Sequence, residues 1–174
     1  MDYRILLRNE IESLRDIDRS ERIEKSYYLE DEKLKIKDNY YNVRGWHPKE
    51  LEYLISRLYD LYDRGGIIYG GFDSSHIVGM IALDSELIGK NKDQLKLDIL
   101  YISSKYRKKG IGRKLVECVI DRAKETSATK LYVSATPTQG TVDFYMRIGF
   151  DLASEINEKL FQLEPEDIHL ELEI

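Results

Sequence analysis

The sequence predicts a mixed α/β fold in one domain, and three observations support this class. Segments with alternating apolar residues are interspersed with segments whose apolar residues recur at helical spacing, so strands and helices are mixed along the chain. The 174 residues, 42% of them hydrophobic, suffice for one sizeable core but are too few for two. No linker, internal repeat or low-complexity tract divides them. We therefore expect residues 1–174 to form a single domain.

The N-terminal part of the chain predicts a strand, a short helix and a hairpin. Residues 2–8 form the predicted strand, and Asn9–Ile17 form a helix that its first residue can cap. A charged, tyrosine-rich stretch follows, in which segments 23–29 and 34–41 flank the polar turn 30–32. This pattern predicts two paired strands.

A long helix and a second hairpin come next. Pro48 suits the first turn of a helix, and apolar residues recur at helical spacing from there to Gly65-Gly66. The apolar segments 67–72 and 77–83 are joined by four polar residues and predict a pair of strands. Residues 84–95 are predicted to form a loop.

The second half of the chain continues as strand, helix, strand and helix. Residues 97–102 are apolar on both alternating faces except for Asp98, which predicts a central strand carrying one carboxylate. Apolar spacing predicts a helix from Ile111 to about Lys124, and residues 130–135 predict the next strand. The last helix of this part is predicted at Thr138–Arg147, with its first residue as the cap.

The C-terminal tail predicts the final strands. Residues 160–163 and 168–174 lie on either side of the turn 164–167, and apolar and polar residues alternate strictly in the second segment. Such alternation is typical of a half-buried strand. This strand either completes the sheet or pairs with another chain, so we expect a monomer or a homodimer.

A concentration of positive charge marks the start of the helix at Ile111. Six of the ten residues at positions 105–114 are basic, although the net charge of the chain is -5. Elsewhere 21 basic residues face 32 acidic ones, which argues against a general nucleic-acid or membrane surface. The N-terminal end of a helix already carries partial positive charge, so clustered cations there need an anion. We therefore expect an anionic ligand, with neither nucleic acid nor membrane as a partner.

The sequence carries no targeting, disulfide or metal signal. Residues 1–8 lack the apolar core of a signal peptide and no apolar run reaches membrane-spanning length, so we expect a cytoplasmic protein. Cys118 is the single cysteine and cannot form an internal disulfide. The three histidines show no metal-ligand spacing with it, so we expect no bound metal.

Two motifs give the chain a resemblance to a known family. The run Arg107-Lys108-Lys109-Gly110-Ile111-Gly112 follows a predicted strand and matches the pattern R/Q-x-x-G-x-G/A, and Phe144–Phe150 contains an aromatic pair followed by Gly-Phe. With these signatures the chain resembles the GNAT superfamily of acyl-CoA-dependent N-acetyltransferases, well over residues 66–152 and elsewhere in element order. The resemblance implies the GNAT fold with a mostly antiparallel sheet, acetyl-CoA (coenzyme A) as co-substrate, and an acceptor-side segment at residues 18–46.

The glycine loop suits this co-substrate on physical grounds. Gly110 and Gly112 let the backbone approach a ligand closely, and free N–H groups of the loop and first helical turn can cradle a pyrophosphate. The alternative is a solvated basic helix start with glycines that serve packing. A Rossmann site would need a third glycine where Leu115 stands, and no P-loop motif is present. The residues expected to contact acetyl-CoA are Leu100, Tyr101, Ile102, Arg107, Lys108, Lys109, Gly110, Ile111, Gly112, Arg113 and Thr138.

The resemblance also implies two catalytic roles. The family's tyrosine at the place of Tyr145 lies near the sulfur of coenzyme A and protonates the departing thiolate, and a phenol of pKa about 10 is a suitable acid for a thiol of about 8.5. The alternative is a core aromatic residue. Some aminoglycoside-acetylating members have a carboxylate at the position of Asp98, which favours Asp98 as the base that deprotonates the amine. A carboxylate satisfied by hydrogen bonds is an equally weighted alternative, and Asp84 and Glu86 are reserve candidates.

The expected reaction is direct transfer in a ternary complex. Cys118 and the serines lack the partners of a catalytic nucleophile, so no acyl-enzyme is expected. In the family, acyl-CoA lies between the strands that here end near Ile102 and span residues 131–134. A backbone N–H near Ile102 would polarise the thioester carbonyl.

The acceptor-side segment carries aromatic residues and carboxylates, which suit a small cationic amine. The alternative is a surface hairpin, because lysines are interleaved with the acids. Three other functions stay open: acetylation of a protein or peptide amine, a non-catalytic acyl-CoA-binding regulatory module, and nucleic-acid binding by the basic run, which the acidic remainder disfavours. The acceptor candidates are Tyr27, Tyr28, Glu30, Asp31, Glu32, Tyr40, Tyr41 and Trp46.

Overall fold

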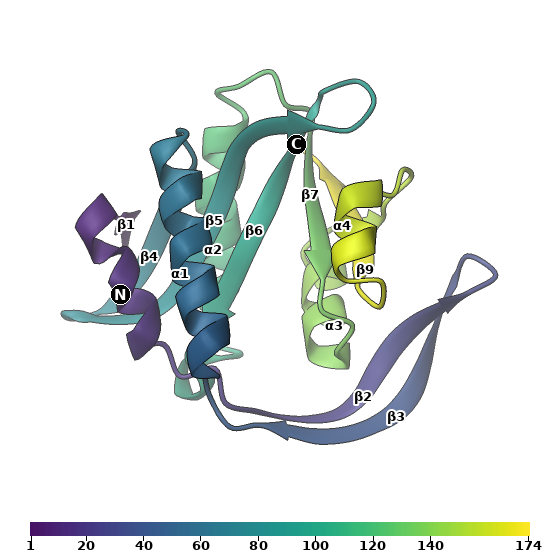
Figure 1. Cartoon of the computed structure of the whole chain (residues 1–174), viewed down its shortest axis with the longest axis horizontal. Helices are drawn as coiled ribbons and strands as arrows, with labels where there is room; N and C mark the ends of the chain where they lie inside the picture. Colours follow the sequence, from purple (N-terminus) through teal and green to yellow (C-terminus); the bar gives the residue numbers. More distant parts are fainter.

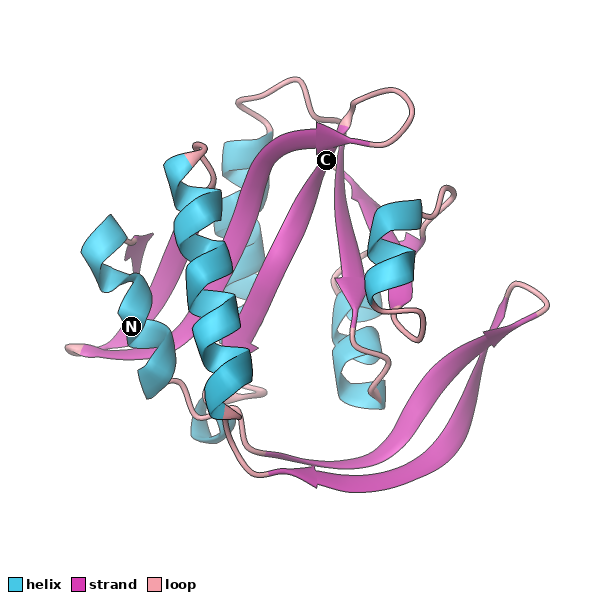
Figure 2. Ribbon diagram, in the orientation of Figure 1, coloured by secondary structure: helices cyan, strands magenta, loops and turns pink.

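Strands from most of the chain assemble into one seven-stranded sheet in a computed structural model that describes residues 1–174 (Figures 1 and 2). The strands are β1 (Asp2–Ile5), β4 (Ile67–Asp73), β5 (His76–Ile88), β6 (Gln94–Ile102), β7 (Lys130–Ala135), β8 (Asp151–Leu152) and β9 (Ile168–Glu173). Their order across the sheet is β1-β4-β5-β6-β7-β9-β8, and β6 with β7 is the single parallel pair. This mixed, mostly antiparallel sheet confirms the predicted fold class.

Helices cover both faces of the sheet. The helix α1 (Pro48–Asp63) and the 3-10 helix η1 (Arg8–Asp16) pack on one face, whereas α2 (Ile111–Ala123) and α3 (Gln139–Arg147) pack on the other (Figure 1). The short α4 (Glu158–Leu163) lies against β7 and β9 on the face that α1 covers. None of these helices combines the length and apolar composition that crossing a membrane requires.

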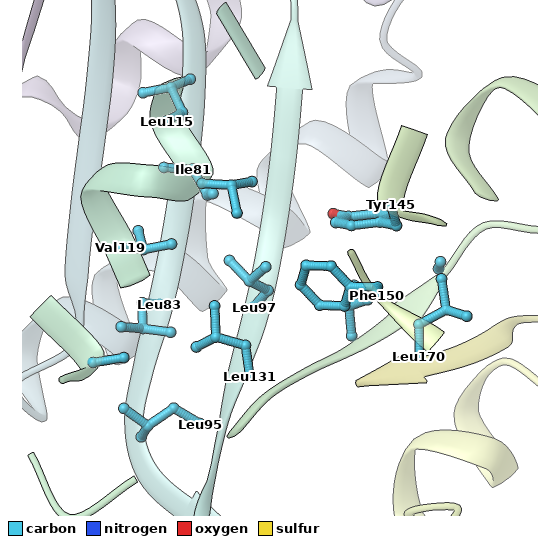
Figure 3. Packing of buried hydrophobic residues seen from close by; sticks show 14 of the residues in the cluster. Ile81, Leu83, Leu95, Leu97, Leu115, Val119, Leu131, Tyr145, Phe150 and Leu170 are labelled. Carbon is cyan, nitrogen blue, oxygen red and sulfur yellow. The ribbon is translucent and has the colours of Figure 1, made fainter. Parts of the chain in front are cut away.

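Each face of the sheet has its own hydrophobic core. On one face, the apolar stripe of α1 and the buried side of η1 pack against residues such as Ile68 and Met80. On the other, the apolar side of α2 packs against Leu97, Leu131 and Phe150, with Tyr145 at the same core (Figure 3). Successive strand residues point to opposite faces, so both cores use the same strands.

The two central strands pair only at their beginning. Residues 94–96 of β6 pair with residues 130–132 of β7, and the remaining six residues of β6 have no strand partner on that side. The strands diverge beyond this point (Figure 1). Their unpaired edges expose backbone N–H and C=O groups, which a bound ligand can satisfy.

A separate hairpin formed by β2 (Glu21–Glu30) and β3 (Lys33–Val43) crosses the diverging ends of β6 and β7 (Figures 1 and 2). The predicted hairpin at 23–29 and 34–41 is therefore confirmed, with longer strands. Its turn residues Asp31 and Glu32 both have positive φ, as tight hairpin turns require. Tyr27 joins the hairpin to the body of the protein, because its N–H donates to the Pro137 carbonyl at 2.7 Å.

The predicted loop at residues 84–95 is wrong. β5 continues to Ile88 and β6 begins at Gln94, so that only residues 89–93 connect them. The pairing of β5 with β6 is interrupted between Leu83 and Leu87 and then resumes. Asp84 stabilises this irregular segment, because its carboxylate accepts hydrogen bonds from the N–H groups of Ser85 and Glu86. The side chain thus supplies the acceptor that a regular ladder would have supplied.

Three further boundaries differ from the prediction. The first strand ends at Ile5, and η1 begins at Arg8 as a 3-10 helix. Asn9 does not cap it, because the Glu10 carboxylate accepts the N–H of Leu7 at 2.8 Å. Residues 160–163 belong to the helix α4 instead of a strand, and the Asn157 side chain caps this helix.

Candidate active site

A bulge in β6 decides where the Asp98 side chain points. The register between β5 and β6 shifts by one residue at Asp98. Its carboxylate reaches Arg57 of α1, whereas Leu100 and Ile102 pack against the core on the α2 face. The prediction that Asp98 shares a face with these two residues is therefore wrong, because the extra residue of the bulge reverses the alternation.

The Asp98 carboxylate is fully engaged. Arg57 Nε lies 3.0 Å from Oδ2 and Lys96 Nζ lies 2.6 Å from Oδ1, while the side chain is only 2% exposed. Asp84 is held similarly by a forked hydrogen bond from Arg64. These contacts match the alternative of a structurally satisfied carboxylate, and neither group has a free oxygen at the surface.

Aromatic and cationic groups gather at the end of β6, on the α1 side. Trp46 packs edge-to-face on Tyr101 with ring centroids 4.8 Å apart, and its indole N–H donates to the Ile17 carbonyl. The Arg19 guanidinium lies 4.9 Å above the Trp46 ring and forms an ion pair with Glu50. Of the acceptor candidates, Trp46 therefore lies beside β6.

The loop between β6 and α2 presents a run of free backbone donors. None of the six consecutive N–H groups from Lys108 to Arg113 donates a hydrogen bond within the protein. Lys108 and Gly110 both have positive φ, at 60° and 82°, as in backbone arrangements that wrap around an anion. The exposed Lys108 and Lys109 side chains have no acidic partner within ion-pair distance.

The two loop glycines serve different needs. A Cβ on Gly110 would meet no atom within 4 Å, so packing does not require glycine at this position. Its positive φ does favour glycine. A Cβ on Gly112 would lie 3.1 Å from the Phe144 ring of α3. Gly112 thus permits close packing between α2 and α3, and this part of the packing alternative is confirmed.

The Arg107 side chain is used within the protein. Its guanidinium donates to the carbonyls of Ile102, Arg19 and Ser20 at 3.1 to 3.2 Å, and it lies 3.3 Å from the Glu21 carboxylate. Arg107 therefore fastens the start of the hairpin to the end of β6. Its predicted contact with a phosphate has no support from this orientation.

Tyr145 lies deep in the core on the α2 face and is 4% exposed. Its ring packs edge-to-face against Phe144 and Phe150, and its hydroxyl forms no hydrogen bond within the protein. In Figure 3 the hydroxyl points toward β6. Burial raises the pKa of Tyr145, and the nearby Tyr101 phenol adds to the rise, so the phenol keeps its proton at neutral pH.

Thr138 caps α3 as predicted. Its side-chain oxygen accepts the N–H of Thr141, and its own hydroxyl donates to the Thr141 hydroxyl at 2.9 Å. Thr138 also forms an isolated bridge with Ser26 of the hairpin. The side chain is therefore occupied by the helix start, close to the hairpin.

Comparison with known proteins identifies the family. The model of the acetyltransferase (GNAT) family matches residues 21–150, which span most of the chain and both predicted motifs. This chain belongs to the GNAT family. It is therefore an acyl-CoA N-acetyltransferase. No curated protein sequence matches the chain.

Solved GNAT structures share the whole fold at low sequence identity. A Bacillus anthracis str. Ames protein described as a streptothricin acetyltransferase, solved with acetyl coenzyme A, is 20% identical, with a TM-score of 0.75 over 99% of this chain and 98% of its own. PaiA N-acetyltransferase from Thermoplasma acidophilum, solved with coenzyme A, is 17% identical with a TM-score of 0.62 over both full chains. The Escherichia coli ribosomal-protein-S18-alanine N-acetyltransferase is 14% identical, with a TM-score of 0.63 over 99% of this chain and 93% of its own.

The GNAT fold brings some predicted site residues together and separates others. The glycine loop, the end of β6 and α3 meet around Ile102, which would lie 3.8 Å from a Cβ on Gly112. Of the acceptor candidates, Glu30–Glu32 lie at the far tip of the hairpin, away from Trp46 (Figure 1). The extended hairpin matches the alternative of a surface hairpin for its acidic tip, and the role of the acceptor candidates stays a prediction.

Sequence reasoning missed a set of polar residues shared by β7 and β9. Ser134 donates to Asp167, and the Tyr132 hydroxyl lies 2.6 Å from His169 Nδ1. The alternation of residues 168–174 predicts a polar face, but the sequence does not show which strand faces it. No three His, Cys, Asp or Glu side chains of the protein lie close enough to hold a metal ion.

Proposed function

We propose that this GNAT enzyme transfers an acetyl group from acetyl-CoA to a primary amine of a small molecule, by direct transfer in a ternary complex. The observation that carries the proposal is the run of six free N–H groups from Lys108 to Arg113 at the start of α2. Such donors, at the positive end of a helix, suit the pyrophosphate of coenzyme A. The side chains of Lys108 and Lys109 add positive charge without a competing carboxylate.

The unpaired edges of β6 and β7 suit the pantetheine arm of the donor. Such an arm carries amide groups that can pair with backbone N–H and C=O groups. It would run past Leu100, Tyr101 and Ile102, where a backbone N–H can polarise the thioester carbonyl. We assign proton donation to the departing sulfur to Tyr145, which is protonated at neutral pH and points toward β6.

The side chains of the protein favour direct attack by the amine. Cys118 is partly buried on α2, and burial raises the pKa of its thiol, so little thiolate is present at neutral pH. No histidine is among the charged groups that shift the pKa of this thiol. An amine that attacks acetyl-CoA directly needs no such nucleophile.

The hairpin supports a small acceptor. It is fastened on one side by Arg107 and on the other by Tyr27, whose hydroxyl donates to Asp143 of α3 at 2.8 Å. Both ties hold β2 across the diverging strand ends, where a long peptide would otherwise enter. The likeness to the ribosomal-protein-S18-alanine N-acetyltransferase keeps a peptide amine as the second candidate.

A thiol-release assay with acetyl-CoA tests the function and the acceptor class together. We expect coenzyme A to appear with at least one class among polyamines, aminoglycosides and amino acids, and not with peptide N-termini. Release with peptides alone would favour the second candidate. Binding of acetyl-CoA in calorimetry without thiol release from any amine would indicate a non-catalytic acyl-CoA-binding module.

A further inference from the structure

Three polar pairs join β7 to β9 or to the residue just before it, on the face that α4 covers. Lys130 pairs with Glu171 at 2.9 Å, Tyr132 with His169 at 2.6 Å and Ser134 with Asp167 at 2.9 Å. Because β-strand residues alternate, the apolar neighbours of these residues point into the opposite core beneath α2 and α3. The polar row therefore lies on the same side of the sheet as α1.

The Ser134–Asp167 pair differs from the other two by its place and its exposure. Ser134 lies two residues beyond Tyr132, the last residue of β7 that pairs with β6. Both members of the pair are partly exposed, whereas Tyr132 and His169 are buried. The pair thus stands at the edge that β6 leaves free.

Asp167 keeps a carboxylate oxygen without a partner. Oδ2 accepts the Ser134 hydroxyl, Oδ1 accepts no hydrogen bond, and no lysine or arginine lies within ion-pair distance of the carboxylate. Asp98, the base expected from the resemblance, has an ion pair at each oxygen and is 2% exposed. Of these two carboxylates beside the diverging strands, only Asp167 has an oxygen that is free to accept a hydrogen bond from a bound amine.

The arrangement of helices limits the direction from which an amine can arrive. The helices α2 and α3 cover one face of the diverging strands, and the proposed phosphate loop begins α2. An acceptor must therefore approach from the face that α1 and α4 share (Figure 1). Ser134 and Asp167 lie on that face.

We propose, on the basis of the acetyltransferase function proposed above, that Asp167 is the base that deprotonates the acceptor amine and that Ser134 positions its carboxylate. The acceptor is then a primary amine bound between β6 and the turn that precedes β9. Asp98, held by Arg57 and Lys96, keeps the bulge of β6 in place.

The proton balance of the step is complete without another reactant. Asp167 takes one proton from the ammonium group and passes it to solvent, which leaves a neutral amine. The nitrogen lone pair forms the bond to the acetyl carbon, and the electron pair of the breaking carbon–sulfur bond goes to sulfur. Tyr145 protonates the sulfur and is reprotonated by the second proton that the nitrogen loses, while the third proton stays on the amide.

The surroundings of Asp167 make its carboxylate a stronger base than that of an exposed aspartate. Burial raises the pKa of Asp167, the carboxylates of Glu164 and Glu166 on the adjoining turn raise it further, and the hydrogen bond from Ser134 lowers it. No cation opposes this rise. A base is most effective when its pKa approaches the working pH.

The test is the pH dependence of kcat/KM for the amine in the full-length protein, measured by thiol release at saturating acetyl-CoA. We expect Asp167→Asn to lower kcat/KM by about 100-fold at pH 7 and by progressively less toward pH 10, where the free amine is abundant. Calorimetric binding of acetyl-CoA should be unchanged. Ser134→Ala should lower kcat/KM less and shift the acid limb of the profile, since it keeps the carboxylate.

Glu173→Gln is the matched control, because Glu173 is an exposed carboxylate at the far end of β9 from Asp167. It should behave as the wild type. An Asp167→Asn variant with wild-type kcat/KM and pH profile would overturn the assignment while leaving the acetyltransferase function intact. If Asp167→Asn fails to fold, an unshifted acid limb in Ser134→Ala decides against it. A wild-type protein that binds acetyl-CoA but acetylates no amine would overturn both proposals.

Discussion

At the scale of single residues, Tyr145 is the group in which core packing and chemistry can be separated. Its ring fills a core position, but its hydroxyl has no partner in the protein. Removing the hydroxyl therefore breaks no hydrogen bond and leaves the ring contacts in place. A hydroxyl with no partner inside the protein, on a ring that is otherwise buried, is free to bond to a ligand.

The change Tyr145→Phe should consequently lower kcat by about 10-fold to 100-fold without weakening acetyl-CoA binding. Stability should stay within about 0.5 kcal/mol of the wild type, because the variant loses no internal bond. Steady-state thiol release, calorimetry and urea unfolding give the three readouts. An unchanged kcat would remove Tyr145 from the chemistry.

Gly110 offers the cleanest residue-scale test of the phosphate loop. A substitution at Gly112 would also press on Phe144, whereas a side chain at Gly110 enters open space. Asn and Asp have similar shapes and tolerate positive φ better than other residues do. The pair Gly110→Asp and Gly110→Asn therefore differs mainly in one negative charge beside the free N–H groups.

We expect Gly110→Asp to bind acetyl-CoA at least about 10-fold more weakly than Gly110→Asn, because like charges repel near the donors. The difference should shrink as salt is raised from 50 to 500 mM. Both variants should lose about 1 kcal/mol of stability from backbone strain. Equal dissociation constants at low salt would contradict an anion site at this loop.

At the scale of elements, the docking of α4 on β9 depends on a neutral histidine. The Asn157 N–H donates to the Tyr132 hydroxyl, which lies 2.6 Å from His169 Nδ1. The other ring nitrogen, Nε2, is buried and has no partner. Burial lowers the pKa of His169, so the folded protein resists protonation more than the unfolded chain does.

The protein should therefore lose stability as the pH falls below about 6.5, where the unfolded chain begins to bind a proton that the folded chain does not. The loss attributable to His169 grows by at most about 1.4 kcal/mol for each pH unit below that, for as long as the folded ring stays neutral. Urea unfolding of the wild type and of His169→Gln at pH 7 and pH 5 measures how much of the stability loss is due to His169. Parallel losses in both proteins would exclude His169 as the cause.

Elements also show where sequence patterns stop being informative. The α1 helix and the hairpin β2–β3 follow from spacing and turn chemistry, and both are present. The direction of Asp98 does not, because one inserted residue in β6 moves its side chain to the other face. A bulge depends on how a strand pairs with its neighbour, and the alternation of residues within one segment does not show that pairing.

At the scale of the whole molecule, the proposed donor side of the site is local in sequence and the proposed acceptor side is not. The spacing of the glycine loop alone places the proposed anion site between a strand and a helix. The Ser134–Asp167 pair joins positions 33 residues apart, and the hairpin reaches Pro137, three residues beyond Ser134, through the N–H of Tyr27. Only the sheet order, which places β9 beside β7, brings these groups together.

Arg107 links the two sides. Its guanidinium joins three backbone carbonyls, one at the end of β6 and two at the start of the hairpin, and it is 29% exposed. Removing it leaves these partly buried acceptors without a donor, at a cost of about 1 to 3 kcal/mol. Lysine cannot replace it, because an ammonium does not reproduce the planar fork of five donors.

We therefore expect Arg107→Ala and Arg107→Lys to lower the free energy of unfolding by a similar amount, about 2 kcal/mol, in urea titrations. Arg22→Ala is the control, since its ion pair with Glu24 is largely exposed and should contribute less than about 0.5 kcal/mol. Hydrogen exchange should also quicken along β2, because the hairpin loses the hydrogen bonds that hold its start to the end of β6. If Arg107→Lys kept wild-type stability, positive charge alone would explain this position, and Arg107 would return to the list of phosphate ligands.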